Sequence, residues 1–317
     1  MGYGSINYDV NPLVNTTLYK RVVLPSFLYG CETWTNLRQV DIMNINKFQH
    51  YAAKLIRNFR KQTRSDMCES LLGLPRLCSE VDKRKLMFFQ KLTMLSYQST
   101  VKQIFLKRLY TFVYKPKGQL GFIPDVYRLF SKYGLSDFFT DYVKHYTFPT
   151  KVAWKRIVNS NIYTFENKEL YQRMNTDSDF CRFISVHSSI KPGVVWTSPK
   201  SSTDLNNAYY VAKMLTCVPQ DCAKICDKCA KTFTDIIYHS IIECNSTSNL
   251  RDQFFDNIIN SFDLNVYVTL DNMHGETFLE TLFGKPSFSE ILDEQEEQNF
   301  RRICYNYLRL MNLKYLK

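Results

Sequence analysis

Glycine and proline, which end helices and shape tight turns, are sparse in this sequence, with ten of each among 317 residues. Bulky aromatic residues are abundant instead, with 23 Phe and 21 Tyr. A fold of many short strands needs frequent turn residues, so this composition favours helices packed through aromatic side chains. Apolar residues make up 45% and charged residues 22%, which excludes wholesale disorder. We therefore predict a mainly α protein, long enough for about two packed units.

The positive charge of the chain is concentrated in its first half. Residues 1–150 carry 22 Lys and Arg against 10 Asp and Glu, whereas residues 151–317 carry 19 against 20. The formal net charge of +11 therefore arises almost entirely before residue 150. Such a one-sided excess is typical of proteins that bind a polyanion, and RNA or DNA is the partner we expect.

Two helical stretches account for much of this basic half. Between Arg38 and Lys61, apolar residues recur every three or four positions, and from Lys47 to Lys61 the basic residues, His50 included, recur with the same period on another face. A second helical stretch is predicted from Cys78 to about Leu109. We predict nucleic-acid contacts at Lys47, Lys54, Arg57, Lys61, Lys83, Arg84 and Lys85. The alternative for such a charge ladder is a solvated helix face.

Aromatic residues are interleaved with these basic positions. They are Phe88, Phe89, Tyr97, Phe105, Tyr110, Phe112 and Tyr114. An aromatic ring can stack on an unpaired base while basic side chains hold the phosphates. The alternative is that each ring fills the hydrophobic core.

The remaining pattern divides the chain into three consecutive regions, 1–115, 116–203 and 204–317. Stop signals predict shorter helices over 125–133, 136–146 and 150–162, and the Ser-, Lys- and Pro-rich stretch 185–203 predicts a linker. Ser287 and Glu290 form a predicted capping box before a helix with an apolar stripe at Phe300, Ile303, Tyr307 and Met311.

The sharpest motif is a Cys-x2-Cys pair followed by a His and a Cys. Cys226 and Cys229 can hold one ion from a single turn, and His239 and Cys244 can close a tetrahedron from the other side. We predict a structural Zn²⁺ on these four residues, since four protein ligands leave no position for a reactive water. Cys217 and Cys222 lie close by and are alternative ligands.

No catalytic signature accompanies this motif. The phosphate-binding loop, the nucleophile elbow and a pair of adjacent aspartates are all missing from the sequence, so we predict no enzymatic activity for this chain alone. The apolar run Val22–Cys31 is too short to cross a bilayer, and no targeting segment precedes it. We expect an intracellular protein, nuclear or cytoplasmic, with mostly reduced thiols and no membrane partner.

Three segments resemble the reverse transcriptases of non-LTR (LINE-type) retrotransposons. Residues 18–34, LYKRVVLPSFLYGCETW, are similar to the segment that follows the palm of that family. Residues 71–77, LLGLPRL, and 83–92, KRKLMFFQKL, resemble its helical thumb, and the Cys226, Cys229, His239 and Cys244 set with Arg251 resembles its C-terminal Cys-Cys-His-Cys element. The order of the motifs also matches, from about residue 12 to the end.

The resemblance implies a thumb-like helical bundle, further helices and a small C-terminal zinc unit. It also implies that the family's palm, with its catalytic aspartates, would lie before residue 1, and an upstream palm is a candidate partner. The expected function is nucleic-acid binding by a C-terminal part of such an RNA-directed DNA polymerase, unable to polymerise alone. The alternative function is a zinc-containing helical scaffold that binds another protein.

Overall fold

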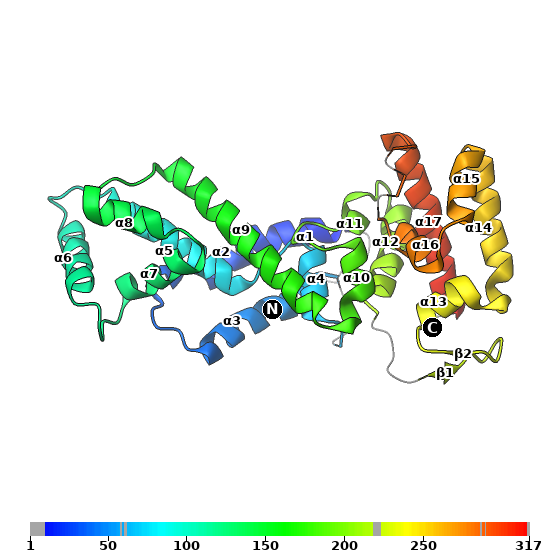
Figure 1. Cartoon of the computed structure of the whole chain (residues 1–317), viewed down its shortest axis with the longest axis horizontal. Coiled ribbons are helices and arrows are strands. Elements are labelled where there is room, and N and C mark those ends of the chain that lie inside the picture. The colour runs from blue at the N-terminus through cyan, green and yellow to red at the C-terminus, as the bar shows by residue number, and fades with distance from the viewer. Residues whose placement is uncertain are drawn as a thin grey trace. The chain divides into compact units, whose positions relative to one another are not determined.

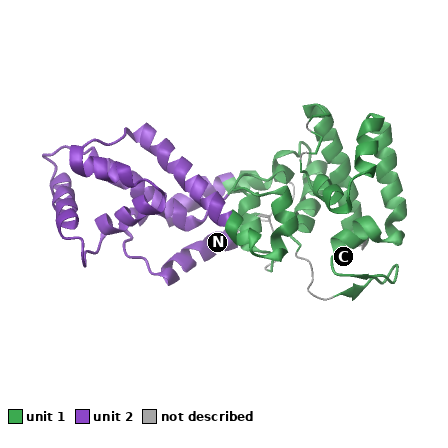
Figure 2. Ribbon diagram, viewed as in Figure 1, with its two compact units in different colours: residues 1–16, 53–73, 171–317 green, residues 17–52, 74–170 purple. Residues whose placement is uncertain are grey.

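The computed structural model describes residues 10–57, 59, 62–217, 223–285, 287–288 and 290–315. Helices dominate these residues, and the two strands found among them have two residues each (Figure 1). The prediction of a mainly α protein is confirmed. The chain forms two compact units, of which unit 1 comprises Met1–Thr16, Ala53–Gly73 and Tyr171–Lys317, and unit 2 comprises Thr17–Ala52 and Leu74–Leu170 (Figure 2).

Unit 2 is built from helices packed on an aromatic core. Its elements are the π-helical turn η1 (Tyr19–Val23), α2 (Leu24–Phe27), the 3-10 turn η2 (Cys31–Thr33), α3 (Gln39–Arg57), α5 (Leu77–Thr93), α6 (Thr100–Tyr114), α7 (Phe122–Lys132), α8 (Ser136–His145) and α9 (Lys151–Asn175), of which α3 and α9 continue into unit 1.

Phe89 of α5 is fully buried at the centre of this core. Five rings surround it at centroid distances between 5.1 and 5.9 Å, and they belong to Phe105, Phe130, Phe139, Tyr142 and Phe148. Tilted and edge-to-face arrangements at these distances are favourable for aromatic pairs. The indole of Trp154 is also fully buried, and its Nε1–H donates to the carbonyl of Leu86 at 3.0 Å.

The helical stretch predicted from Cys78 to about Leu109 consists of two helices, because α5 ends at Thr93 and α6 begins at Thr100. The last carbonyls of a helix lack backbone donors, and here a side chain from the next helix supplies one. The ammonium of Lys102 donates to the carbonyls of Leu92 and Thr93 at 3.2 and 2.7 Å. The buried Lys102 thereby stabilises the end of α5 at Thr93, before α6 begins.

Unit 1 consists mainly of helices from the second half of the chain. Its elements are α1 (Pro12–Leu18), which continues into unit 2, α4 (Ser65–Leu71), η3 (Ser178–Phe180), α10 (Cys181–Val186), α11 (Val194–Thr197), α12 (Ser202–Leu215), β1 (Lys224–Ile225), β2 (Thr232–Phe233), α13 (Ile236–Tyr238), η4 (His239–Glu243), η5 (Asn245–Thr247), α14 (Ser248–Ser261), α15 (Leu264–Asp271), α16 (Gly275–Leu282) and α17 (Glu294–Tyr315).

The long helix α17 packs against α12 and α14. The predicted apolar stripe of α17 faces this core, with Phe300, Tyr307 and Met311 buried. The predicted capping box at Ser287 and Glu290 is wrong. The reciprocal bonds lie six residues further along: the backbone N–H of Glu296 donates to Asp293, and that of Asp293 donates to Glu296.

The predicted linker 185–203 is also wrong, because much of this stretch packs into unit 1. Trp196 is fully buried, and the N–H of Gly193 donates to the carbonyl of Leu71 at 2.9 Å. Gly73 adopts a φ of +63°, and a Cβ there would lie 2.8 Å from the ring of Pro192. Only glycine fits this position, both for its backbone conformation and for the close approach.

These contacts explain why the units do not follow the three consecutive regions expected from composition. Residues 53–73 join the C-terminal part of the chain through the 185–203 stretch and through ion pairs. Arg64 contacts Asp177 at 2.7 Å and Asp179 at 3.3 Å, and Arg173 contacts Asp66 at 3.2 Å. Composition along the chain does not reveal such long-range pairs.

Candidate metal centre and basic surface

The Cys-x2-Cys pair sits in the turn of a short antiparallel hairpin. Strands β1 and β2 pair Lys224 with Phe233 and Ile225 with Thr232. The turn closes by two backbone bonds, from Cys226 N–H to the carbonyl of Lys231 and from Ala230 N–H to the carbonyl of Cys226. Ala230 adopts a φ of +59°, which lets the chain reverse directly after Cys229. The hairpin thus presents both thiols on one side of the turn.

The other two side chains come from the segment that follows the hairpin. Asp235 caps α13, where its Oδ1 accepts from the N–H groups of Ile237 and Tyr238. The chain then forms the π-helical turn η4, which begins at His239 and ends immediately before Cys244. Both side chains are nearly fully buried, at 1% and 2% exposure. The wide turn brings His239 and Cys244 to face the hairpin.

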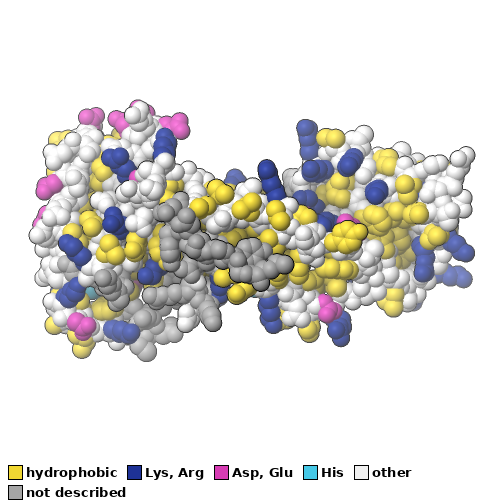
Figure 3. All heavy atoms as spheres, turned by 180° about the vertical axis from the view of Figure 1, so that it is seen from behind, with side chains coloured by type: hydrophobic (Ala, Val, Ile, Leu, Met, Phe, Trp, Pro, Cys, Tyr) yellow, Lys and Arg dark blue, Asp and Glu magenta, His cyan; other side chains and the backbone are white. Residues whose placement is uncertain are grey.

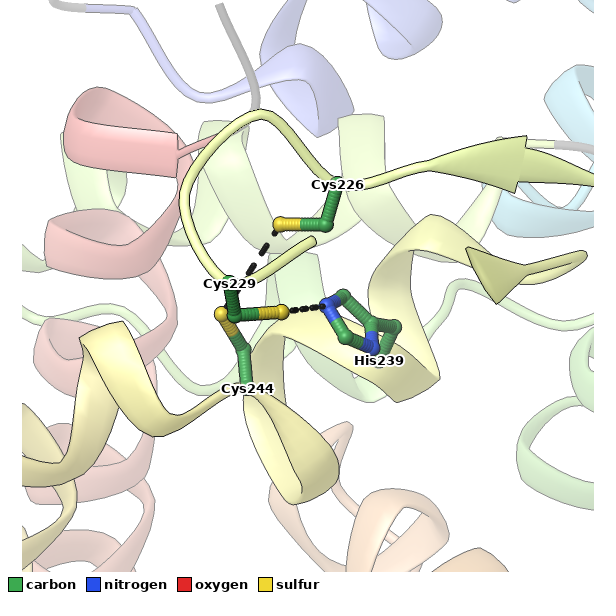
Figure 4. Close-up of side chains that lie close together, drawn as sticks. All are labelled: Cys226, Cys229, His239 and Cys244. Carbon is green, nitrogen blue, oxygen red and sulfur yellow. Dashed lines mark hydrogen bonds between the residues drawn. The ribbon is translucent and has the colours of Figure 1, made fainter. Parts of the chain in front are cut away.

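Four potential ligand atoms converge between these segments (Figure 4). The sulfurs of Cys226, Cys229 and Cys244 and a nitrogen of His239 all lie within 4.8 Å of one another. Cys229 Sγ is 3.3 Å from His239 Nε2, and Cys226 Sγ is 4.0 Å from Cys244 Sγ. Ligands about 2.3 Å from a tetrahedral ion are about 3.8 Å apart, and a disulfide needs about 2.05 Å. The group therefore can hold a metal ion, and its sulfurs are not paired as disulfides.

A second layer of contacts orients these groups. His239 Nδ1 lies 3.2 Å from Oε2 of Glu243, and the ring of Phe233 stacks on the imidazole at a centroid distance of 5.0 Å. Arg251 donates to the carbonyl of Cys244 at 3.0 Å. Carboxylates and carbonyls in such positions fix the tautomer and orientation of metal ligands. Sequence reasoning did not assign Glu243, although a Glu four residues after the His was a usable signal.

The pKa values of the thiols differ within the cluster. A backbone hydrogen bond from Lys231 favours the thiolate of Cys229, but burial and contacts with the sulfurs of Cys226 and Cys244 outweigh it and raise the pKa of Cys229. Burial opposes ionisation of Cys226, but hydrogen bonds from the backbone N–H groups of Lys228 and Cys229 outweigh it and lower its pKa to about 6. Burial likewise opposes ionisation of Cys244, and hydrogen bonds from the hydroxyl and N–H of Ser246 lower its pKa. Thiolates are the metal-binding form of cysteine, so these bonds favour metal binding.

The two alternative ligands do not enter this group. Cys217 is exposed just after α12 and does not belong to the cluster of described residues. Cys222 lies outside the residues that the structure describes.

The predicted basic ladder is only partly described. Lys47 is exposed on α3 and Lys54 is half-buried, while Arg57 is placed by its backbone alone and Lys61 lies outside the described residues.

The basic triplet at the start of α5 is mostly engaged within unit 2. Lys83 lies 3.4 Å from Glu80, and Arg84 donates to the carbonyl of Leu28 at 3.1 Å. Lys85 is buried, and its ammonium is 2.7 Å from Asp125. Lys85 is therefore not on the surface where we expected it, because it neutralises a carboxylate of α7.

The interleaved aromatic residues separate into two groups. Phe89 and Phe105 are buried, and Phe88 and Phe112 are half-buried against the same core. Tyr97, Tyr110 and Tyr114 are exposed, at 61%, 39% and 78%. The four phenylalanines are buried or half-buried in the core of unit 2, whereas the three tyrosines, which carry a polar hydroxyl, are exposed to solvent.

No family model, no curated protein and no solved structure matches this chain. Among the described residues, no helix has both the length and the apolar character that crossing a bilayer requires.

Proposed function

We propose that this chain is a nucleic-acid-binding module stabilised by a structural zinc ion, of the kind that follows the palm in non-LTR retrotransposon reverse transcriptases. One observation carries the proposal: residues 83–124 contain nine Lys or Arg and no Asp or Glu. The nine residues are Lys83, Arg84, Lys85, Lys91, Lys102, Lys107, Arg108, Lys115 and Lys117. Such an acid-free stretch favours a polyanionic partner.

Five of these side chains are exposed on unit 2, at Lys91, Lys107, Arg108, Lys115 and Lys117. On the face of unit 2 drawn in Figure 3, Lys and Arg side chains predominate over acidic ones. Exposed ammonium and guanidinium groups bind phosphates and release the counterions condensed on them. Phosphate contacts would therefore dominate binding, which makes it sensitive to salt.

The donor set supports zinc as the ion. Three thiolates and one imidazole suit Zn²⁺ in both softness and tetrahedral geometry. The hairpin that carries Cys226 and Cys229 has exposed strands, so the ion would supply the stability that its small core does not. Free thiols in this arrangement fit a reducing compartment, nuclear or cytoplasmic.

Binding rather than catalysis is the proposed role of this chain. Adjacent aspartates occur nowhere in the sequence, and the Cys–His cluster is the one group of three or more potential metal ligands among the described residues. DNA synthesis would need the palm of an upstream partner. Primer extension by the purified chain, abolished by a substitution within it, would contradict this part of the proposal.

The charge hypothesis is tested with two matched triple variants. Lys107→Glu/Arg108→Glu/Lys115→Glu reverses exposed charges of unit 2, and Lys191→Glu/Lys200→Glu/Arg302→Glu makes the same total change on exposed residues of unit 1. Fluorescence anisotropy measures binding to a labelled structured RNA and a DNA duplex at about 50 and about 500 mM salt. For each phosphate contact, we expect the logarithm of the wild-type binding constant to fall by about 0.7 to 0.9 when the salt concentration rises tenfold.

The triple variant of unit 2 should bind much more weakly, and its affinity should depend less steeply on salt concentration. The triple variant of unit 1 should bind like wild type. Equal losses in both variants would show a nonspecific effect of net charge. An affinity that does not change with salt, or no binding at all, would reject the proposed function.

A further inference from the structure

Three tyrosines with exposed rings meet at one edge of unit 2, beside the loop that follows α8. Tyr110 and Tyr114 lie one helical turn apart on α6, and Tyr146 directly follows the last residue of α8. Their exposed fractions are 39%, 78% and 46%. Helix α6 lies at the margin of the unit in Figure 1, so these rings border solvent. We call Tyr110, Tyr114 and Tyr146 the tyrosine cluster.

The cluster is held together by its own contacts. The rings of Tyr110 and Tyr114 are nearly parallel, at 18° with centroids 6.4 Å apart. The hydroxyls of Tyr110 and Tyr146 are hydrogen-bonded to each other, and the ring of Tyr146 meets that of the buried Tyr142 edge-on at 6.1 Å. These contacts restrict the rings while leaving much of their surface accessible.

The backbone at Tyr146 is unusual for an aromatic residue. Its φ of +55° lies in the left-handed region, which glycine adopts most readily. Helix α7 ends in the ordinary way, with Gly134 at a φ of +67°. A tyrosine in the corresponding conformation after α8 costs backbone strain, and strained residues are concentrated at functional sites. This strained position lies in the same cluster as the exposed rings.

The charge around the cluster is positive. Lys107 lies one turn before Tyr110 on α6, and Lys115 and Lys117 follow Tyr114. Helix α8 adds Lys144 and His145 next to Tyr146. The acidic residues of α8, Asp137 and Asp141, lie in its earlier turns.

We propose that the tyrosine cluster binds unpaired bases of single-stranded RNA or DNA, with Lys107, Lys115 and Lys117 holding the adjacent phosphates. An exposed aromatic face can stack on any base, and cations beside it bind the backbone. Bases inside a duplex are already stacked on one another and offer no free face. The inference rests on the proposed function and adds strand selectivity to it.

The test compares single strands with a duplex on the full chain. The probes are fluorescein-labelled oligo-U RNA, oligo-dT DNA and a mixed-sequence DNA duplex, each of roughly 15 nucleotides or base pairs. The variants are Tyr114→Leu, which removes the most exposed ring, Tyr114→Phe, which keeps a stacking ring, and Tyr146→Gly, which also relieves the left-handed strain. Tyr29→Leu is the control, because Tyr29 is 87% exposed elsewhere in unit 2.

We expect Tyr114→Leu and Tyr146→Gly to weaken single-strand binding about 5- to 100-fold and to change duplex binding less than about twofold. Tyr114→Phe and Tyr29→Leu should bind both like wild type. Comparing oligo-U with oligo-dT shows whether RNA or DNA is preferred.

Ultraviolet cross-linking of wild-type protein to a 5-bromouridine oligomer, mapped by mass spectrometry, should modify peptides 108–115 or 145–151. This measurement does not depend on the folding of any variant.

Four outcomes decide between this inference and the proposed function. If wild type binds no nucleic acid, both fail. If it binds but Tyr114→Leu and Tyr146→Gly keep single-strand affinity, or the cross-links fall elsewhere, the inference fails while the proposed function stands. If the variants lose single-strand and duplex binding equally, the cluster does not recognise unpaired bases. Binding of a protein to this face without any nucleic-acid binding would overturn both proposals.

Discussion

The imidazole of His239 is held between two partners, because Nδ1 contacts the carboxylate of Glu243 at 3.2 Å while Nε2 faces the thiol of Cys229 at 3.3 Å. The carboxylate accepts a hydrogen bond from the Nδ1–H group. The lone pair of Nε2 is then directed towards the sulfurs. His239 is 1% exposed, so the Nδ1 atom contacts Glu243 in place of solvent. Glu243 therefore positions the imidazole within the Cys–His group that could hold a metal ion.

We predict that Glu243→Gln weakens zinc binding about 10- to 100-fold, because it removes the anionic acceptor that orients His239. Competition with a chromogenic chelator measures the affinity. The control is Asp227→Asn, which removes one exposed acidic charge from the turn between Cys226 and Cys229 without touching the imidazole. Equal losses in the two variants would mean that general electrostatics, and not the Nδ1 contact, accounts for the effect.

We predict that removing the metal unfolds the hairpin and the π-helical turn but leaves the helical core of unit 1 folded. Strands β1 and β2 are largely exposed, whereas Leu308 and Met311 of α17 are fully buried. Hydrogen exchange with and without a chelator should show increased exchange over 224–247 and unchanged protection over 202–215. Co²⁺ added to the metal-free protein should give the visible absorption of a tetrahedral thiolate site, and Cys244→Ser should weaken it. Unchanged exchange over 224–247 would show that these residues fold without an ion.

The Cys–His group that could hold a metal ion was predictable because its geometry is local. Cys226 and Cys229 share one turn, and His239 and Cys244 share another, so spacing alone indicates two pairs of ligands. The helical period likewise predicted α17, whose stripe at Tyr307 and Met311 is buried. Local sequence carries both signals.

The fates of individual lysines were not predictable, because they depend on distant partners. Lys85 pairs with Asp125, 40 residues away, and Lys102 meets the phenol of Tyr142 at the same separation. Before the fold is known, either lysine resembles the exposed Lys107. Polar composition was equally misleading at 185–203, where Trp196 and the close approach of Pro192 to Gly73 fix the segment in unit 1.

We predict that Lys102→Met lowers the free energy of unfolding by roughly 1–3 kcal/mol, because it removes the ammonium that donates to three buried acceptors. The acceptors are the carbonyls of Leu92 and Thr93 and the hydroxyl of Tyr142. Urea unfolding followed by circular dichroism measures the change. Lys107→Met is the control, since Lys107 is exposed on the same helix. A similar stability for the two variants would show that the hydrogen bonds from Lys102 to the last carbonyls of α5 do not stabilise the fold.

The same lysine gives a prediction for alkaline pH. Burial lowers the pKa of Lys102 below its ordinary value of 10.5, so the unfolded chain binds this proton more tightly than the folded chain. Stability from this group therefore rises with pH between the lowered pKa and 10.5. The stability difference between wild type and Lys102→Met should grow over this range. A difference that stays constant or shrinks as pH rises would contradict the burial of a charged ammonium.

The last prediction concerns the carboxylate of Glu166, which is fully buried in unit 2. Arg76 contacts it through Nε and Nη2 at 2.8 and 2.9 Å, and the hydroxyl of Ser79 donates to it at 2.6 Å. Burial opposes its ionisation, but these hydrogen bonds outweigh burial and lower the pKa of Glu166 below 4.5. We expect Glu166→Gln to reduce the free energy of unfolding by about 3–5 kcal/mol at neutral pH, because Arg76 then loses its buried counterion.

The stability that Glu166 contributes should decrease at acid pH. Because the folded pKa of Glu166 is depressed, its contribution is fully present above 4.5 and is lost as pH falls through the folded pKa. Urea unfolding of both proteins at pH steps from neutral to acid should show the difference between wild type and Glu166→Gln shrinking below this point. Glu169→Gln is the control, since Glu169 is half-exposed and 3.8 Å from Arg76, and it should change stability by less than about 1 kcal/mol. If Glu166→Gln and Glu169→Gln lost equal stability, the buried pair with Arg76 would not be the contact that stabilises unit 2.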